Sequence, residues 1–206
     1  VESNVLGKAT RVTRVAALRQ LRELYALDRD VPLFRALRDL WEVEPTAQPV
    51  LALLCATARD PLLRVSADRI LETTVGDIGN ASQLGETIER AYPGRYKESV
   101  RGVTGRNLIA SWRQSGYLTP APARERRRIE PQVTSVAYAL LLGYLCGARG
   151  ELLLDTFWTT LLDAPAHRIR ELAAIAGRQG WLEYRHAGGI TEMTFRRFLR
   201  PEGTNE

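Results

Sequence analysis

The chain has 206 residues, of which 45% are hydrophobic, so it can bury one large or two small cores and is not disordered throughout. Its net charge is +5, and Lys8 and Lys97 are the only lysines among its 29 cationic residues. Arginine suits phosphate because its planar group donates two parallel hydrogen bonds, although an arginine-rich composition is also typical of GC-rich genomes. The longest apolar run, Val136 to Ala148, is shorter than the ~20 residues of a membrane span.

These features predict a cytoplasmic protein that does not associate with a membrane. No signal peptide is recognisable at the start of the sequence, although the chain does not begin with Met. Cys55 and Cys146 lie in apolar stretches, which predicts buried thiols rather than a disulfide framework. Free thiols fit a reducing compartment.

The first 75 residues predict four helices. Leucines and valines recur at helical spacing near the start of the chain, and arginines fall mostly off that stripe. Asp30 and Asp60 stand where helix N-caps are expected, each with a proline in the following turn. The predicted helices cover residues 10–26, 31–43, 46–59 and 60–75, and a loop is expected at 76–82.

The middle of the chain predicts a short helix, a long helix and an irregular connection. The short helix ends near Pro93, and the long helix runs from Lys97 to Ser115, where Gly116 stops it. The segment from Thr119 to Gln132 contains three prolines and no apolar period, which favours an extended or mobile connection. The side chains expected on the inner side of the long helix are Val100, Val103, Leu108, Ile109 and Trp112.

The last third predicts three helices followed by a β-hairpin. The helices are expected at 134–148, 151–162 and 165–179, and two alternating segments flank the glycines at 188 and 189. This order is that of a winged helix, a helix-turn-helix with an added hairpin. The stretches "SWRQSGYL" and "AGRQGWLEY" also end two helices in nearly the same way, which indicates one structural unit used twice.

The predicted fold class is mainly α, with helix-turn-helix or winged-helix-like units and one short β-hairpin near the C-terminus. A helical N-terminal domain is expected at 1–118, ending in a helix-turn-helix-like unit. A basic, proline-rich connection or wing follows at 119–132, and a C-terminal winged-helix-like domain at 133–206.

The positive charge is local. Nine cationic residues and two glutamates lie between residues 95 and 128, an excess that is larger than the net charge of the whole chain. A basic third helix and wing are typical of a surface that binds duplex DNA, although the arginine run at 126–128 alone is also typical of a solvated linker. The predicted DNA-binding residues here are Arg95, Lys97, Arg101, Arg106, Asn107, Arg113, Arg124, Arg126, Arg127 and Arg128.

Catalysis is not expected. His167 and His186 are the only histidines, and neither has cysteines or carboxylates at metal-ligand spacing. The sequence contains no nucleophile elbow and no phosphate-binding glycine loop. No catalytic residue, metal site or cofactor is therefore predicted.

Four stretches resemble the BrxA family of BREX phage-exclusion systems: "NVLGKATRVTRVAALRQLRELYAL", "LFRALRDL", "PVLALLCATARDPLL" and "SVRGVTGRNLIASWRQSGYL". The similarity spans about residues 4–200 and rests on pattern rather than on one motif. It implies a small helical DNA-binding protein of host defence, encoded beside a methyltransferase, an ATPase and a phosphatase-like protein. By position it adds Lys8, Arg11 and Arg14 as DNA contacts, whereas the residues alone favour a solvated helix face.

The functional prediction is a non-catalytic accessory protein of a bacterial phage-defence system that binds double-stranded DNA and possibly proteins of the same operon. Two alternatives remain open. One is a winged-helix transcription regulator with an effector pocket, which predicts a firm dimer and a palindromic site. The other is a scaffold whose winged helices bind proteins, because fold alone does not decide function. The sequence does not determine the oligomeric state.

Overall fold

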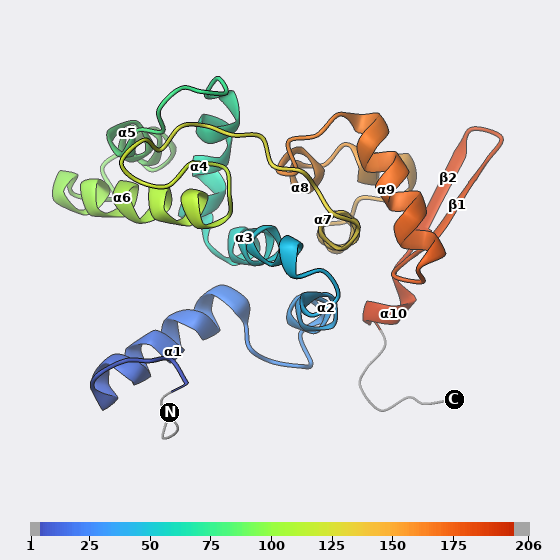
Figure 1. The fold of residues 1–206 in the computed structure, drawn as a ribbon, viewed down its shortest axis with the longest axis horizontal. Helices are drawn as coiled ribbons and strands as arrows, with labels where there is room; N and C mark the ends of the chain where they lie inside the picture. The colour runs from blue at the N-terminus through green and yellow to red at the C-terminus, as the bar shows by residue number, and fades with distance from the viewer. Residues whose placement is uncertain (1–4, 200–206) are drawn as a thin grey trace.

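The computed structural model describes residues 5–199 and is mainly helical, with one two-stranded antiparallel hairpin near the C-terminus (Figure 1). The predicted fold class is confirmed. Within the described residues, every helix is too short or too polar to span a membrane.

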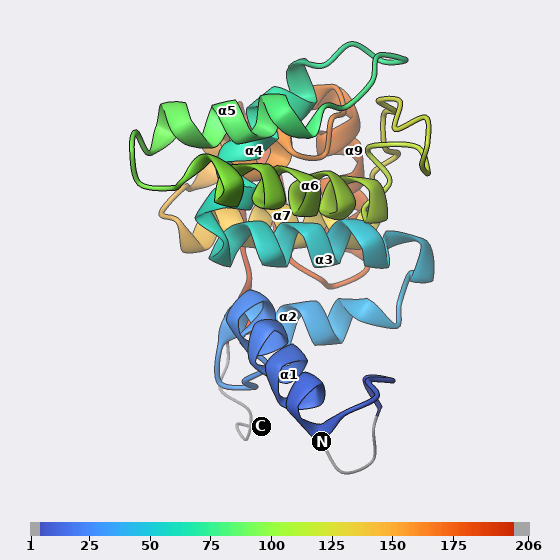
Figure 2. The same cartoon turned by 90° about the vertical axis from the view of Figure 1, so that its left-hand side faces the viewer.

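Three helices form the N-terminal part: α1 (Arg11–Tyr25), α2 (Pro32–Trp41) and α3 (Gln48–Arg59), with a short 3-10 helix at Pro45–Ala47 before α3. Thr10 caps α1, and its hydroxyl accepts a hydrogen bond from the backbone N–H of Thr13 at 3.2 Å. No residue of α1 is fully buried, and α1 stands out from the rest of the molecule (Figures 1 and 2).

The next part has the connectivity of a winged helix. It contains α4 (Pro61–Glu72), α5 (Ala81–Ala91) and α6 (Glu98–Gln114), and Asp60 and Asn80 cap α4 and α5. Backbone hydrogen bonds join three extended segments: 76–79 pairs with 124–126, and 124–127 pairs with 117–119. The segment predicted as an extended or mobile connection therefore folds back and is hydrogen-bonded along its middle.

The C-terminal part repeats this order. The apolar helix α7 (Val133–Leu145) is buried at ten successive positions and packs against α3 and α9. After it come a 3-10 helix η2 (Gly150–Leu154), α8 (Phe157–Thr160), α9 (Ala166–Arg178), β1 (Glu183–Ala187), β2 (Ile190–Thr194) and α10 (Arg196–Leu199). In the hairpin, Glu183 pairs with Thr194 and Ala187 pairs with Ile190.

The prediction of a single helix at 151–162 is wrong, because non-helical residues separate η2 from α8. Asp155 leaves the helical region of the backbone with φ −128°, and Thr156 is extended. Thr156 then caps α8 through a reciprocal pair of hydrogen bonds with Thr159. A hydroxyl that competes for backbone N–H groups in this way favours a new helix start over a continuous helix.

The two repeated stretches end α6 and α9 with the same geometry. Gly116 and Gly180 have φ values of 90° and 76°, which glycine adopts without strain. The N–H of the aromatic residue after each glycine donates to a carbonyl five residues back, Tyr117 to Trp112 and Trp181 to Ala176, both at 3.0 Å.

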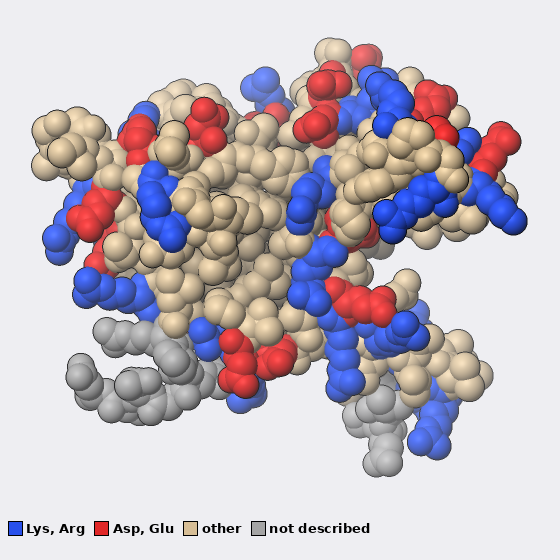
Figure 3. Space-filling view, turned by 180° about the vertical axis from the view of Figure 1, so that it is seen from behind, with Lys and Arg blue, Asp and Glu red and all other residues tan. Residues whose placement is uncertain are grey.

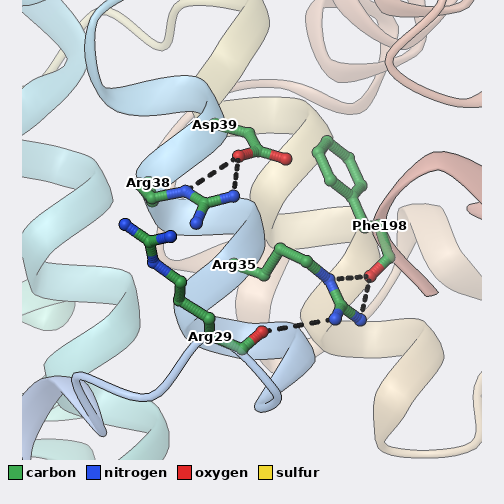
Figure 4. A network of polar contacts seen from close by, with 5 residues as sticks. All are labelled: Arg29, Arg35, Arg38, Asp39 and Phe198. Carbon is green, nitrogen blue, oxygen red and sulfur yellow. Dashed lines mark hydrogen bonds and ion pairs between the residues drawn. The ribbon is translucent and has the colours of Figure 1, made fainter. Parts of the chain in front are cut away.

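A buried arginine fastens the end of the described chain to α2 (Figure 4). Arg35 is 5% exposed, and its Nε and Nη2 both donate to the carbonyl oxygen of Phe198, at 3.1 and 2.9 Å. Its Nη1 donates to the carbonyl oxygen of Arg29 at 3.3 Å. The carbonyl oxygens of Phe198 in α10 and of Arg29 before α2 thus solvate this buried cation, and the bonds to Phe198 hold α10 beside α2.

Close contact between α5 and α6 fixes which side of α6 faces inward. A Cβ added at Gly105 would overlap the carbonyl oxygen of Ala81, so only glycine permits this approach. Trp112 is fully buried on the same side, and its indole Nε1 donates to the hydroxyl of Ser66 at 2.8 Å. Val100 and Val103, predicted on the inner side, are instead 46% and 50% exposed because this contact turns them outward.

Replacing Gly105 by Ala is expected to destabilise the protein by about 1–3 kcal/mol, because α5 and α6 must move apart to admit the methyl group. Gly102 is the matched control on the same helix, since a Cβ there would lie 3.7 Å from its nearest neighbour, Nη1 of Arg106. Gly102→Ala should stabilise by roughly 0.5–1 kcal/mol through helix propensity. Urea unfolding of both variants measures this, and equal effects of the two substitutions would contradict the packing argument.

The two cysteines differ in exposure, so the prediction that both are buried is wrong for one of them. Cys55 is fully buried on α3, where burial raises the pKa of its thiol to about 11. Cys146 follows the last turn of α7 and is exposed.

Ellman's reagent should therefore modify one thiol per chain in the native protein and two after unfolding in denaturant. The fast thiol should disappear in Cys146→Ser and remain in Cys55→Ala, because a buried thiol with a raised pKa offers little thiolate. Rapid native reaction of Cys55 would show that the core around α3 opens readily.

Candidate nucleic-acid interface

Helix α6 lies at one edge of the molecule with one side open to solvent (Figures 1 and 2). Leu108, Ile109 and Trp112 anchor its inner side in the core. Its open side carries Arg106 and Asn107, both exposed. The side chains that join them there are Val100, Val103 and the half-buried Arg113.

Sequence reasoning missed the two valines of this surface. A valine at helical spacing is ordinarily an inward residue, and nothing in the periodicity alone places Val100 and Val103 outside. The available signal was the glycine at 105, because a glycine within a helix often marks a close approach of another backbone. An exposed apolar group on such a helix can contact the methyl group of thymine.

The cations at the start of α6 and just before it differ in their contacts. The Arg101 guanidinium forms an ion pair with Glu89 and donates to the carbonyl oxygen of Tyr96 at 2.9 Å. Arg95 is exposed, with its guanidinium carbon 5.6 Å from the ring centre of Tyr92. Lys97, at the N-cap position of α6, is exposed. Arg101 therefore helps to position the turn between α5 and α6, while Arg95 and Lys97 leave their charge at the surface.

The wing segment after α6 adds three exposed cations. Arg124, Arg127 and Arg128 are exposed, while Arg126 between them points inward. Hydrogen bonds to segments 76–79 and 117–119 hold this stretch, so the adjacent side chains of Arg126 and Arg127 point to opposite sides. The exposed cations thus follow α6 and continue onto its wing.

Arg126 does not belong to the exposed group, so its assignment as a DNA contact is wrong. Its side chain is 1% exposed, and its Nη2 lies 2.6 Å from Oδ2 of Asp163, in the turn before α9. Its Nε donates to the carbonyl oxygen of Ile70 at 2.9 Å, and the guanidinium also contacts the carbonyl oxygen of Arg127. A guanidinium satisfied in this way is not available to phosphate.

Tyr117 lies beside Arg126 and strengthens the same junction. Its ring centre is 5.4 Å from the guanidinium carbon of Arg126, and its hydroxyl donates to the carbonyl oxygen of Leu161. Full burial raises the pKa of Tyr117 far above its usual value, so the phenol stays protonated and keeps donating. The first wing and the turn before α9 therefore share one polar, buried contact.

Arg126→Met should lower the free energy of unfolding by about 3 kcal/mol, because it leaves the Asp163 carboxylate without its partner. The loss lies near the lower end for a broken buried pair because the Asp163 side chain is 18% exposed. The neighbouring Arg127→Gln is the control and should stay within about 0.5 kcal/mol of the wild type. Urea unfolding measures both.

Adding Asp163→Asn to Arg126→Met should recover part of the loss, because it removes the unpaired charge. Asparagine also tolerates the φ of 49° at this position. A double variant no more stable than Arg126→Met would mean that Arg126 stabilises the junction by packing and not by its charge.

The N-terminal cations lie away from this surface. Lys8 and Arg11 are exposed, and the half-buried Arg14 donates from Nη1 to the carbonyl oxygen of Lys8 at 3.3 Å. Helix α3 lies between α1 and α6 (Figure 2). The structure therefore does not bring the two predicted groups of DNA-contacting residues onto one helix face.

Ion pairs neutralise the corresponding surface of the second unit. On α9, Arg168 pairs with Glu171 at 2.8 Å, and Arg170 pairs with Glu151 of η2. Thr191 of β2 also donates to Glu151, and these two hydrogen bonds lower the pKa of Glu151 below its usual value. The α9 surface thus differs in charge from the α6 surface although the connectivity is the same.

Within residues 5–199, no group of three or more His, Cys, Asp or Glu side chains could hold a metal ion. His167 is exposed, and Nδ1 of His186 lies 2.8 Å from the Thr191 hydroxyl. Comparison of the chain with models of protein families, with curated proteins and with solved structures gives no match.

Proposed function

We propose that this protein binds double-stranded DNA through α6 and the wing that follows it, and that it acts without catalysis. The observation that supports this most is the open side of α6, where Arg106, Asn107 and Arg113 stand free of carboxylate partners in the described residues. Their arrangement suits a helix that enters the major groove, with the wing beside the neighbouring phosphates.

The chemistry of these side chains fits such a complex. Arginine pairs with guanine, asparagine with adenine, and apolar groups contact the thymine methyl, so Arg106, Asn107 and Val103 supply the three kinds of base contact. Arg124 and Arg127 on the wing would neutralise phosphates without reading sequence. Arg101 would hold the turn before α6, because Glu89 already pairs with it.

The accessory role in a phage-defence system rests on the resemblance to the BrxA family alone. The genes next to this one would test it, since neighbouring genes for a methyltransferase and a large ATPase support the role. An unrelated neighbourhood would leave a DNA-binding protein of another pathway, including a transcription regulator. Sedimentation would then separate the regulator, which requires a stable dimer, from a monomeric accessory protein.

Replacing Arg106 and Arg113 together by Gln should weaken duplex binding and make it less dependent on salt. Loss of the base contact of Arg106 should cost about 1–3 kcal/mol of affinity, and loss of a phosphate contact at Arg113 should lower the slope of log K against log salt by about 0.9. Fluorescence anisotropy with a labelled duplex at several salt concentrations measures this slope. Arg178→Gln on α9 is the control and should bind as the wild type does.

A slope that stays the same in the Arg106 and Arg113 variant would contradict the assignment of α6 as the DNA-contacting helix. Equal losses in the Arg178→Gln control would mean that only the total charge of the protein matters. Melting temperatures close to that of the wild type are required of both variants, because both substitutions are at solvent-accessible positions.

A protein partner is the second candidate for the C-terminal unit. The paired charges of Arg168 and Arg170 favour it, because a surface without excess positive charge has little attraction for phosphate. The tip of its hairpin also exposes 74% of Ile190, an apolar side chain of the kind that protein interfaces cover.

A further inference from the structure

Four arginines outside the α6 surface form a second strip of positive charge. Seen from behind, Lys and Arg side chains follow one another from the body of the molecule onto the lobe that α1 makes (Figure 3). Helix α3 contacts both α1 and α4. Glu23 lies among Arg19, Arg22 and Arg59, in an ion pair with Arg19 at 2.9 Å. We call this group the back strip: Arg19, Arg22, Arg59 and Arg64.

Backbone carbonyl groups hold two of these guanidinium groups in place. Nε of Arg59 donates to the carbonyl oxygen of Glu23 at 2.6 Å, which joins the end of α3 to α1. Arg64 donates from Nε to Thr57 and from Nη2 to Ala58, at 3.2 and 2.7 Å. A guanidinium has five N–H donors, so each of these exposed groups keeps donors for a further anion.

The strip is concave where α1 meets α3. A hollow of about 310 Å³ has Val15 and Leu18 in its lining, and Arg19, Arg22 and Arg59 also line it. Apolar side chains beside fixed cations suit a sugar-phosphate backbone, in which apolar deoxyribose faces alternate with phosphates. Fixing the guanidinium groups before binding also reduces the side-chain entropy that binding removes.

We propose that the back strip is a second contact for the DNA backbone, separate from α6, which extends the length of duplex that this protein covers. This inference rests on the proposed function of α6. The strip would carry no sequence preference, because arginines that meet only phosphate and sugar do not read bases. Its role is to add affinity that depends on duplex length and on salt.

A duplex explains the strip better than an acidic protein helix does. The hollow exposes only two larger apolar side chains, whereas a docked helix is held by apolar anchors along several turns. The guanidinium groups of the strip also come from three helices, α1, α3 and α4, so its positive charge extends beyond the hollow to Arg64. A polymer with regularly spaced charge can contact cations on several elements at once.

The test compares two duplexes, one of about 12 bp, little more than one helical turn, and one of about 30 bp. Binding of the full chain to each is measured by anisotropy over a range of salt. The strip variant carries Arg22→Gln, Arg59→Gln and Arg64→Gln. On the long duplex its salt slope should fall by up to about 2.7, at about 0.9 per contact, and on the short duplex it should match the wild type.

Two further variants complete the design. Arg59→Lys with Arg64→Lys keeps the charge, so its slope on the long duplex should stay near that of the wild type even if the ends of α1 and α3 loosen. The Arg106 and Arg113 double variant should lose affinity for both duplexes. If the lysine variant instead loses as much slope as the glutamine variant, the loss comes from loosened ends of α1 and α3 and not from lost charge. The inference would then be overturned.

The remaining outcomes separate this inference from the proposed function. If the strip variant binds both duplexes as the wild type does, while the α6 variant is impaired, the strip does not contact DNA and only this inference fails. If the strip variant is equally impaired on both duplexes, the strip belongs to the same short contact as α6, and a second contact separate from α6 is excluded. If the wild type binds neither duplex, both proposals fail.

Discussion

The guanidinium group of Arg126 joins the part of the molecule that contains α4 to α6 to the part that contains α7 to α9. The Arg126 side chain extends from the first wing and packs over the ring of Tyr117. Its guanidinium group forms an ion pair with Asp163 in the turn before α9. Its remaining donors meet backbone carbonyl groups, so a buried positive charge is solvated entirely by protein. This contact joins the first wing to the turn before α9.

Two units with the same connectivity carry opposite surface chemistry. Their third helices end with the same glycine turn, yet α6 leaves Arg106 and Arg113 without acidic partners, whereas Glu171 and Glu151 pair with Arg168 and Arg170 of α9. A winged helix therefore sets the position of an exposed helix, and the neighbours of each charge decide what that helix can bind. The charge difference supports DNA for the first unit and a protein for the second.

Helix α1 gains little from the hydrophobic core. None of its residues is fully buried, and a helix of 15 residues is marginal in water without tertiary packing. Leu24 and Tyr25 reach the core, and the hydrogen bond from Arg59 to Glu23 holds the same end of the helix. The more distant turns of α1 project from the body with their arginines, in the position where a polyanion could add the stabilisation that the core does not provide.

The sequence by itself determined the mainly helical fold, the hairpin around Gly188 and Gly189 and, outside residues 150–160, the boundaries of the predicted helices to within a few residues. These features depend on local signals, namely apolar periodicity, caps and glycine turns, which act over a few residues. The sequence also located the excess positive charge between residues 95 and 128. It could not say which of those charges stay exposed.

Only the tertiary structure decided the direction of individual side chains. Gly105 meets Ala81 of α5, and this contact turns Val100 and Val103 outward against the prediction from periodicity. In the sequence, Arg126 is one cation of a basic run. In the structure it lies 2.6 Å from Asp163, which is 37 residues further along the chain. Contacts between residues so far apart arise only when helices pack, because local sequence patterns carry no information about the partner on another element.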